Sequence, residues 1–450
     1  MMLKRIFAAV ISAAMMLALS SCGKNDNEQV PDIAVTEDGK KIVKMYVWNT
    51  NSDIEKAAGD FNGKSSEYRV EITDYTEKYP DEPLTHLSND IIIGNLPDII
   101  LLDSYSMPVE SYIAKGLFAN LYDFMDSDES FNRADYLESY FMAYEVNGKL
   151  YELSPEFVIN TIVGKTSVIG ETRGWTMNEF ISFADENPDR NIFNGIYNKG
   201  NILTFFINSC CGDYFNSRTG ECRFDSGDFI GLLEFCDRFP NETPENYYDT
   251  VDINEYETQW RTGGTLLDFG LISDFMSLRR EEAVTFGEPV TVKGFPAEQV
   301  SGLSFNNYGI ELAITAKADN GEGAWEFLKY FLSDEYQDKS YMFPIKLSAI
   351  EKKAEASKER PFFTDENGDK VYTDIETIGG QEVNIGVNTD EDIRRVMDII
   401  NSADSTWNYD SQITKIVTEE AGAYFAGQKS AKEAAEIIQN RVQNYLDENR

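Results

Sequence analysis

Two short segments of the sequence place an aromatic ring beside a carboxyl or amide group directly after a predicted strand. Trp48 and Asn49 follow KIVKMYV, and Asp103 and Tyr105 follow the apolar run LPDIILL. Aromatic rings cover the apolar faces of a ligand, whereas carboxylates and amides exchange hydrogen bonds with its hydroxyl groups. This combination is typical of a binding cleft for a small molecule that has both kinds of surface.

Groups for other kinds of chemistry are scarce. The chain has one histidine, His86, in a polar stretch, so histidine triads and histidine metal clusters lack their parts. The five cysteines show no C-x-x-C spacing, which argues against zinc. Cys211 and Cys222 flank a turn-rich segment and could form a disulfide, with free buried thiols as the alternative. We expect no catalytic residue, no metal and no cofactor.

An alternating series of elements positions the residues at the strand ends. The sequence predicts strands at 42–47 and 68–75, helices at 54–61 and 81–93, and a strand buried on both faces within 96–104. Strands that alternate with helices imply an open α/β sheet with parallel strands. Ligands of such sheets meet the carboxyl ends of the strands, which is where the candidate residues lie.

Turn and capping signals organise the rest of the chain. Asn147 and Gly148 predict a hairpin turn, after which the chain crosses through Pro155 into a new strand. Thr176 and Glu179 have the spacing of a capping box, which predicts the start of a helix. The C-terminal end is predicted to be nearly all helical.

The N-terminus has the pattern of an export signal. Lys4 and Arg5 precede an apolar run at 6–19, which is short for a bilayer span of about 20 residues. The Leu-Ser-Ser-Cys that follows resembles the bacterial lipobox, in which the chain is cut before the cysteine, here Cys22, and the thiol is acylated. The alternative is an ordinary signal peptide with an incidental cysteine.

The lipobox divides the start of the chain into two segments. We expect a signal peptide at 1–21 and a lipidated, flexible tether at 22–39, whose residues are mostly polar. An acyl anchor, with palmitate as the expected chain, would hold the protein on the extracellular face of the cell membrane. That location is the periplasm if the cell has an outer membrane.

The net charge excludes several classes of partner. The chain has 40 basic and 78 acidic residues, and loss of Lys4 and Arg5 with the signal peptide takes the net charge from −38 to −40. Nucleic-acid binding needs the opposite sign, and charge attraction to an anionic membrane surface is unexpected for the same reason. Roughly 410 residues follow the tether, which is enough for two domains of ordinary size.

Several segments, in order along the chain, have the form of one family's motifs. They are KMYVWN, GNLPDIILLDS, KGLFANLYDFMD, NGKLYELSPEF, GWTMNEF, KGFPAE, AWEFLKYFLSDEYQ and the helical tail. With the lipobox, they resemble the sugar-type extracellular solute-binding lipoproteins of bacterial ABC importers, of the maltodextrin-binding kind. Two departures are the extra Ser154 before the crossover proline and the reversed order of Trp175 and Thr176. None of the motifs encodes the substrate.

The resemblance implies an α/β, two-lobed, periplasmic-binding-protein-like type II fold, in which each lobe is an open sheet flanked by helices and hinge strands join the lobes. Lobe one would comprise 40–152 plus 306–357, and lobe two 153–305 plus 358–450. Such a protein captures a solute, here expected to be a sugar or oligosaccharide, and delivers it by lobe closure to ABC transporter permease subunits. It is not an enzyme, and we expect a monomer.

The candidate ligand contacts come from both expected lobes. The predicted ligand-binding residues are Trp48, Asn49, Asp103, Tyr105, Glu156, Phe157, Trp260, Asp268, Phe269 and Trp407. Trp407 precedes a helix, at a place where the family often has a cleft aromatic. Tyr341 and Phe343 are weaker candidates. Core packing or helix capping is the alternative role for each of these residues.

An insertion at 361–388 departs from the simple family pattern. Its acidic and polar residues at calcium-loop spacing are Asp365, Asn367, Asp369, Thr373 and Glu376. Lys370 stands where such a loop needs glycine, and Asn367 with Gly368 predicts an ordinary hairpin turn, which we favour.

The sequence leaves two other functions open. A glycoside-active enzyme would need two carboxylates about 5–9.5 Å apart, and the 78 acidic residues leave such a pair open. A surface lipoprotein that captures glycans without a transporter would share the predicted fold and cleft.

Overall fold

The computed structural model describes residues 33–104, 106–216, 219–243, 252–307, 309–407 and 410–448. The predicted signal peptide, Cys22 and Tyr105 lie outside these ranges. All the elements below belong to one compact unit that begins at Val35. No helix within the described ranges combines the length and the apolar run that crossing a bilayer requires.

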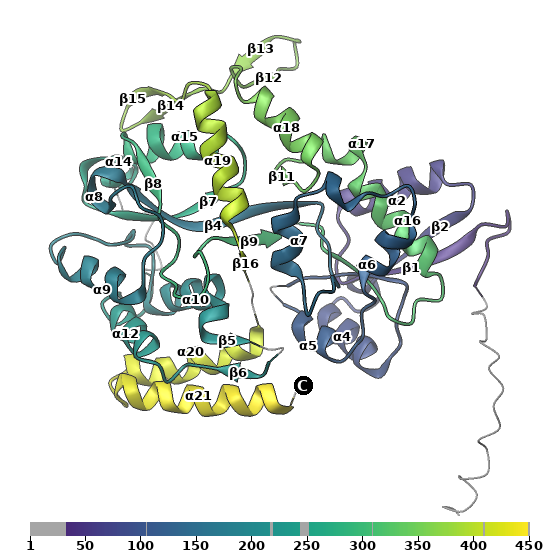
Figure 1. Cartoon of the computed structure of the whole chain (residues 1–450), viewed down its shortest axis with the longest axis horizontal. Coiled ribbons are helices and arrows are strands. Elements are labelled where there is room, and N and C mark those ends of the chain that lie inside the picture. Colours follow the sequence, from purple (N-terminus) through teal and green to yellow (C-terminus); the bar gives the residue numbers. More distant parts are fainter. Residues whose placement is uncertain are drawn as a thin grey trace, which may run out of the picture. The chain divides into compact units, whose positions relative to one another are not determined.

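The first sheet has four strands in the order β10-β3-β1-β2, of which β1 and β2 are labelled in Figure 1. β1 (Lys41–Val47) runs parallel to β2 (Tyr68–Asp74) and β3 (Ile99–Leu101), whereas β10 (Leu312–Ile314) pairs antiparallel with β3. Buried and half-buried residues alternate along β1, and all three residues of β3 are buried. The prediction of parallel strands is confirmed for the first three strands, and a distant segment adds the antiparallel edge.

Helices cover this sheet where the capping signals place them. Asn51 accepts hydrogen bonds from the backbone N–H groups of Asp53 and Ile54, and thereby caps α2 (Ser52–Lys64). α4 (Pro83–Ile93) ends at Gly94, whose φ of 82° is in the left-handed region that favours glycine. α16 (Gly321–Leu332) packs against β1, β10 and α2. Both helices predicted between the strands are confirmed.

The second sheet is built around one long strand, β4 (Glu156–Lys165). β7 (Leu267–Ile272), β8 (Val290–Val292), β9 (Ser304–Asn307) and β11 (Phe343–Pro344) all pair antiparallel with β4. β16 (Ser405–Thr406) adds a parallel strand beside β9. The strand predicted after Pro155 is therefore the centre of this sheet.

Two chain segments that connect the sheets lie side by side. Before β4, Leu153 exchanges two backbone hydrogen bonds of 2.9 Å with Leu312 at the start of β10. Within the second sheet, Phe157 of β4 lies opposite Asn307 at the end of β9. The chain thus leaves the first sheet through β4 and returns to it from β9 along an adjacent path.

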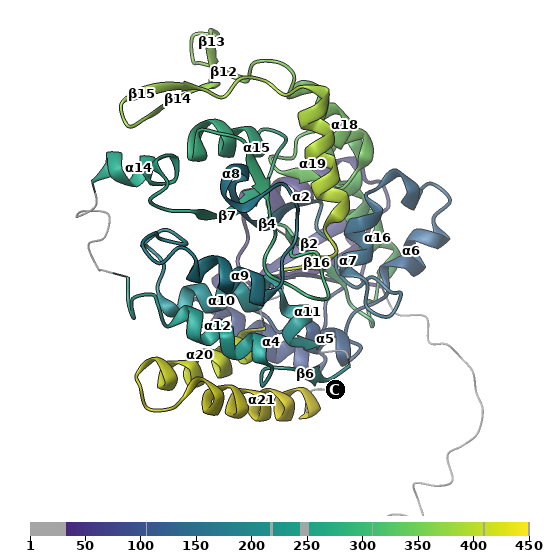
Figure 2. The ribbon, with the colours of Figure 1, turned by 60° about the vertical axis from the view of Figure 1, so that its left-hand side comes forward.

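Helices pack around the second sheet and form a second apolar core. They include α9 (Met177–Asp185), α10 (Lys199–Ser209), α12 (Gly227–Cys236), α20 (Ser411–Phe425) and α21 (Ala431–Glu448). Thr176 and Glu179 form the predicted capping box of α9. The last two helices lie side by side in Figures 1 and 2, which confirms the predicted helical C-terminal end, and each buries an apolar face, with Tyr445 half-buried at the edge.

Shorter elements complete the described part. The helical ones are α3 (Tyr75–Lys78), α5 (Val109–Ala114), α6 (Leu121–Ser127), η1 (Arg133–Asp135), α7 (Glu138–Tyr144), α8 (Thr166–Ile169), α11 (Cys211–Tyr214), α14 (Ile253–Thr262), α15 (Ser277–Arg280), η2 (Glu281–Phe286), α17 (Asp334–Gln337), α18 (Leu347–Ala356) and α19 (Asp390–Ser402). β5 (Phe215–Asn216) pairs with β6 (Glu221–Cys222). The predicted Asn147-Gly148 turn is confirmed, since both residues have positive φ and Val146 pairs with Lys149.

The insertion consists of two hairpins at the upper edge of Figure 1. β12 (Phe362–Thr364) pairs with β13 (Lys370–Tyr372), and β14 (Ile375–Ile378) pairs with β15 (Gln381–Asn384). The Asp365 carboxylate accepts from the backbone N–H groups of Asn367 and Asp369, and Gly368 has a φ of 87°. The hairpin interpretation is confirmed. Across the described residues, no three His, Cys, Asp or Glu side chains gather in a way that could hold a metal ion.

Three cysteines of the described part are buried free thiols, namely Cys210, Cys222 and Cys236. Since Cys222 is free, the alternative of buried thiols holds for it, and it takes part in no disulfide. Burial raises the pKa of the Cys222 thiol to about 11.

Candidate functional site

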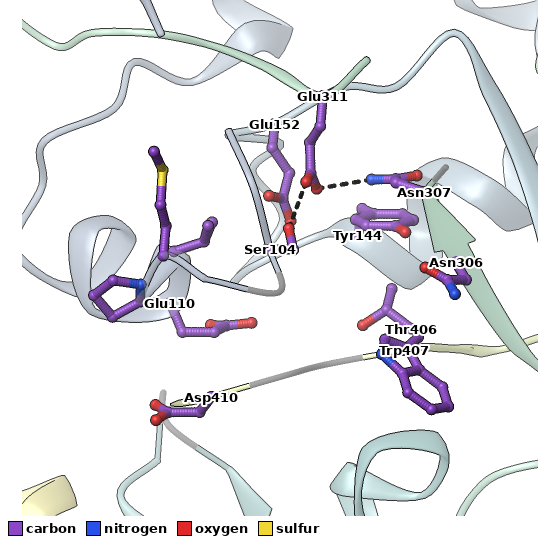
Figure 3. A pocket seen from close by; sticks show the side chains of 13 residues that line it. Ser104, Glu110, Tyr144, Glu152, Asn306, Asn307, Glu311, Thr406, Trp407 and Asp410 are labelled. Carbon is purple, nitrogen blue, oxygen red and sulfur yellow. Dashed lines mark hydrogen bonds between the residues drawn. The ribbon is translucent and has the colours of Figure 1, made fainter. Parts of the chain in front are cut away.

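A cleft forms where residues from both sheets and from the start of α20 converge, and Figure 3 shows its lining. We call it the acidic cleft. Its polar and aromatic lining residues are Ser104, Glu110, Tyr144, Glu152, Asn306, Asn307, Glu311, Thr406, Trp407 and Asp410, with Met107, Pro108 and Val109 as the apolar ones. They come from the loop after β3, from α5 and α7, from the segments just before β4 and β10, from β9, and from β16 and the residues after it.

Neutral donors hold Glu311 at the top of the acidic cleft in Figure 3. The Ser104 hydroxyl donates to Glu311 Oε2 at 2.5 Å, and Asn307 Nδ2 donates to Glu311 Oε1 at 2.9 Å. Glu311 is only 5% exposed. Its carboxylate is therefore fixed in place by hydrogen bonds, and no ion pair with another described residue balances its charge.

Glu152 lies beside Glu311, with the two carboxyl groups adjacent in Figure 3. Burial, and after it the charges of Glu311 and Glu110, raise the pKa of Glu152 well above its usual range. Its Oε2 atom is buried and has no hydrogen-bond partner among the described residues. Two neighbouring acids in a site of low polarity favour one shared proton over two charges.

Trp407 forms the opposite wall. Its backbone N–H donates to the Phe305 carbonyl at 2.7 Å, which continues the pairing of β16 with β9 and sets the position of the side chain. The indole Nε1 is buried and has no acceptor among the described residues. The ring meets Phe205 edge-on, with centroids 5.7 Å apart.

A second cavity of about 590 Å³ lies on the other side of Phe205, and we call it the aromatic cavity. Its lining residues are Asn194, Ile196, Tyr197, Asn201, Phe205, Thr243, Tyr256, Trp260, Asp268 and Phe269. Phe269 of β7 stacks on Phe205 at 4.7 Å and on Phe193 at 4.2 Å, with interplanar angles of 14° and 9°. Trp407, Phe205 and Phe269 thus form a continuous row of rings from the acidic cleft into the aromatic cavity.

A carboxyl pair also borders the aromatic cavity. Burial and the charge of Glu281 raise the pKa of Asp268 well above its usual range. Burial also raises the pKa of Glu281 to about 7. The indole nitrogen of Trp260 donates to the Leu267 carbonyl at 3.0 Å, and the residue is 8% exposed, so it contributes a mostly buried wall.

The structure brings four of the predicted site residues together. Trp407 lines the acidic cleft, and Trp260, Asp268 and Phe269 line the aromatic cavity. Asp103 does not line either cavity, but its neighbour Ser104 lines the acidic cleft.

Other predicted residues lie elsewhere. Trp48 is half-buried against an apolar cluster of the first sheet, and Asn49 is exposed. Glu156 lines a separate cavity of about 360 Å³ together with Tyr341. These four residues line neither the acidic cleft nor the aromatic cavity.

Phe157 needs a correction. It is fully buried and stacks on Phe343, with ring centroids 5.5 Å apart. The reason is its position on β4, where Phe157 itself pairs with Asn307 of β9 on one side and with Phe343 of β11 on the other. Both phenylalanines are core residues in this structure, so the core-packing alternative applies to them.

The sequence reasoning missed the cleft residues that only tertiary contacts bring together. Glu152 and Glu311 stand 159 positions apart in the chain, and neither belongs to a motif with a chemical signal. Glu152 lies three positions before the crossover proline, Pro155, and Glu311 directly precedes β10. A search for carboxyl groups next to chain crossings would have found both.

A family model described as bacterial extracellular solute-binding protein matches residues 56–367, which is more than half of the chain. The chain belongs to this family. The resemblance suggested by its motifs is therefore confirmed, and the protein is an extracellular solute-binding protein. No curated protein sequence matches it significantly.

Solved structures agree with this assignment. The sugar-binding protein MalE from Xanthomonas citri has a TM-score of 0.54 at 12% identity, over 91% of this chain and 98% of that chain. An ABC substrate-binding protein from Listeria monocytogenes in complex with cycloalternan has a TM-score of 0.51 at 12% identity, over 91% and 99%. The cyclic alpha-maltosyl-1,6-maltose binding protein from Arthrobacter globiformis has a TM-score of 0.51 at 13% identity, over 91% and 100%. These likenesses confirm the predicted two-lobed α/β fold class of this solute-binding protein.

Proposed function

We propose that this solute-binding protein captures a sugar or oligosaccharide outside the cell and delivers it to the permease subunits of an ABC importer. The observation that carries the proposal is the row of rings formed by Trp407, Phe205 and Phe269. The row connects the acidic cleft with the aromatic cavity, and both have carboxyl and amide groups on their walls that can bind hydroxyls. Ring faces suit the apolar C–H faces of sugars, and the carboxyl and amide groups beside them suit the hydroxyls. The similar structures named above bind sugars or are named for doing so.

Binding without chemical change is the function that we favour. Two carboxyl groups of the acidic cleft are held by neutral partners, since Glu311 accepts from Ser104 and Asn307 and Asp410 caps α20, which supports a role in binding. A glycoside-active enzyme is the alternative, and incubation of the purified protein with oligosaccharides would reveal it by the appearance of shorter products. A glycan-capturing lipoprotein without a transporter would bind the same ligands but have no permease genes beside its own.

The proposal includes the anchor and the lobes. The mature chain would begin at the acylated Cys22 and carry lobe one at 40–152 plus 306–357 and lobe two at 153–305 plus 358–450. Mass spectrometry of the protein purified from its native membrane would detect the expected diacylated N-terminal peptide. An unmodified Cys22, or a mature chain that starts elsewhere, would contradict this part.

Trp407 offers the direct test of the site. In Trp407→Ala we expect the dissociation constant for the best sugar from a thermal-shift screen to rise about five- to thirtyfold, because a ring that covers a sugar face contributes about 1–2 kcal/mol. The matched control is Tyr341→Ala, since Tyr341 is 92% exposed and lines a different cavity. Isothermal titration calorimetry measures both. Equal affinity in the two variants would remove Trp407 from the site.

A further inference from the structure

The acidic cleft has an unusual charge balance. Its 13 lining residues include Glu110, Glu152, Glu311 and Asp410 but no lysine, arginine or histidine. The neighbouring residues outside the described ranges, at 105, 308, 408 and 409, are three tyrosines and an asparagine in the sequence, so they add no basic group. The positive charge that would normally accompany several buried carboxyl groups is therefore missing from the protein side.

The hydrogen-bond partners of Glu311 and Asp410 are neutral. Glu311 accepts from Ser104 and Asn307. Asp410 accepts from the backbone N–H groups of Gln412 and Ile413 and from the Tyr445 hydroxyl. Hydrogen bonds of this kind stabilise an ionised carboxylate but leave its negative charge in place.

Two buried polar atoms in the cleft have no partner among the described residues, and they are of opposite kinds. Glu152 Oε2 can accept a hydrogen bond, and Trp407 Nε1 can only donate one. Because an unsatisfied buried polar atom costs about 1–3 kcal/mol, both favour a ligand that satisfies them. An ammonium group would satisfy Glu152, and a hydroxyl or ring oxygen would satisfy Trp407.

We propose that the ligand is a cationic amino sugar or amino-sugar oligosaccharide, whose ammonium group binds at Glu152 and Glu311 while its sugar ring packs along Trp407. This inference rests on the proposed function and specifies its substrate class. The rings of Tyr144 and Trp407 line the same cleft and can add cation–π attraction. Uronic acids and other anionic sugars are rejected, since they would meet the carboxyl groups with the same charge.

Binding of the ammonium group is coupled to a proton. In the free cleft Glu152 holds its proton, because burial, Glu311 and Glu110 raise its pKa. The arriving cation favours the ionised form, so Glu152 loses the proton to the buffer as it accepts from the ammonium group. The ligand keeps its own charge, so binding of a cationic sugar is accompanied by net proton release.

The test compares free-amine glucosamine disaccharides and trisaccharides with their N-acetylated counterparts, which differ in the charged group. Calorimetry at pH 6.5 in buffers of different ionisation enthalpy measures affinity and proton release together. We expect the free-amine forms to bind at least tenfold more tightly, because a charge-assisted hydrogen bond in a buried site is worth about 1.5–3 kcal/mol. We also expect proton release on binding with the free-amine forms alone.

Two variants test whether Glu152 causes the preference for the free-amine sugars. Glu152→Gln should remove the preference for the amine and the proton release, since Gln retains the shape of the side chain but cannot ionise. Glu156→Gln is the matched control, because Glu156 is also half-buried with a raised pKa but lies in another cavity. The Glu156→Gln variant should prefer the free-amine sugars over the N-acetylated sugars as strongly as the natural sequence does.

The outcomes separate the two proposals. Equal or tighter binding of the N-acetylated or other neutral sugars would overturn the inference and leave the proposed function intact. Failure of all sugars, neutral, cationic and anionic, to bind would overturn the proposed function itself. The comparison on the unaltered protein decides the inference even if Glu152→Gln does not fold.

Discussion

At the scale of single residues, the protein buries carboxyl groups beside one another instead of beside cations. Glu152 lies next to Glu311, and Asp268 interacts with Glu281. In both pairs burial is the largest cause of the raised pKa, and the neighbouring negative charge adds to it for Glu152 and Asp268. The pairs therefore make stability and binding depend on pH.

Glu281 gives a pH-dependent prediction with a defined window. Its pKa is about 7 in the folded protein against an ordinary value of 4.5, so between these pH values the folded state binds more protons than the unfolded chain. The free energy of unfolding therefore falls as pH rises from 4.5 to 7, by roughly 1–3 kcal/mol from this group after allowance for partial exposure. Glu281→Gln should reduce that slope.

Urea unfolding at pH 4.5, 5.5, 6.5 and 7.5 measures the slope. Glu366→Gln is the control, because Glu366 is exposed in the insertion and its replacement should leave the slope unchanged. A slope that is the same in Glu281→Gln as in the natural sequence would show that Glu281 does not titrate in this window.

At the scale of elements, the pairing of β4 with β7 requires a residue without a side chain at one point. Gly270 of β7 lies opposite Thr161 of β4. A Cβ atom at Gly270 would lie 2.4 Å from the Val163 Cγ2 atom, which is far inside van der Waals contact. The neighbouring Phe269 is part of the ring row, so this strand also positions the aromatic cavity.

Gly270→Ala should lower the free energy of unfolding by about 1–3 kcal/mol, since the extra methyl group forces β4 and β7 apart or displaces Val163. Gly422→Ala is the matched control on α20, where a Cβ atom would meet nothing within 4 Å. Alanine is the better helix former by about 1 kcal/mol, so the control should be neutral or stabilising. Equal unfolding midpoints for the two variants in urea would contradict the steric argument.

Local signals in the sequence predicted the elements well. Asn51, the Thr176–Glu179 capping box and the Asn147–Gly148 turn act through bonds to residues a few positions away, so sequence spacing suffices to find them. The antiparallel addition of β10 to the first sheet depends on a pairing over more than 200 positions, which no local pattern encodes.

At the scale of the whole molecule, two sheets are joined by adjacent crossing segments. Leu153 pairs with Leu312 and Phe157 with Asn307, so the outgoing and returning paths are hydrogen-bonded to each other. Adjacent crossings of this kind can act as a hinge, since a few residues absorb the rotation while each sheet stays rigid. The acidic cleft takes residues from both sides of these crossings.

Ligand should therefore close the proposed lobes. We expect the radius of gyration of the mature protein, measured by small-angle X-ray scattering, to decrease at saturating sugar, because the cleft is completed by contacts to residues of both sheets. Trp407→Ala at the same sugar concentration should keep the radius of the free protein. A radius that stays constant at saturation, confirmed by calorimetry in the same buffer, would contradict closure.

The sequence by itself determined the family, the strand and helix order of the first sheet, and the presence of aromatic and acidic residues suited to a cleft. These features depend on composition, short motifs and the periodicity of burial. It also pointed to Trp407, Asp268 and Phe269, which the structure places on the cavity walls.

The tertiary structure decided which residues meet. Phe157 lies in the core because β9 and β11 enclose it, and Glu152 meets Glu311 because two crossings bring distant segments together. A side chain's burial, and the charge beside it, depend on neighbours from anywhere in the chain. Spacing along the sequence carries no information about such neighbours, so only the folded arrangement could show a cleft rich in carboxyl groups without a cation.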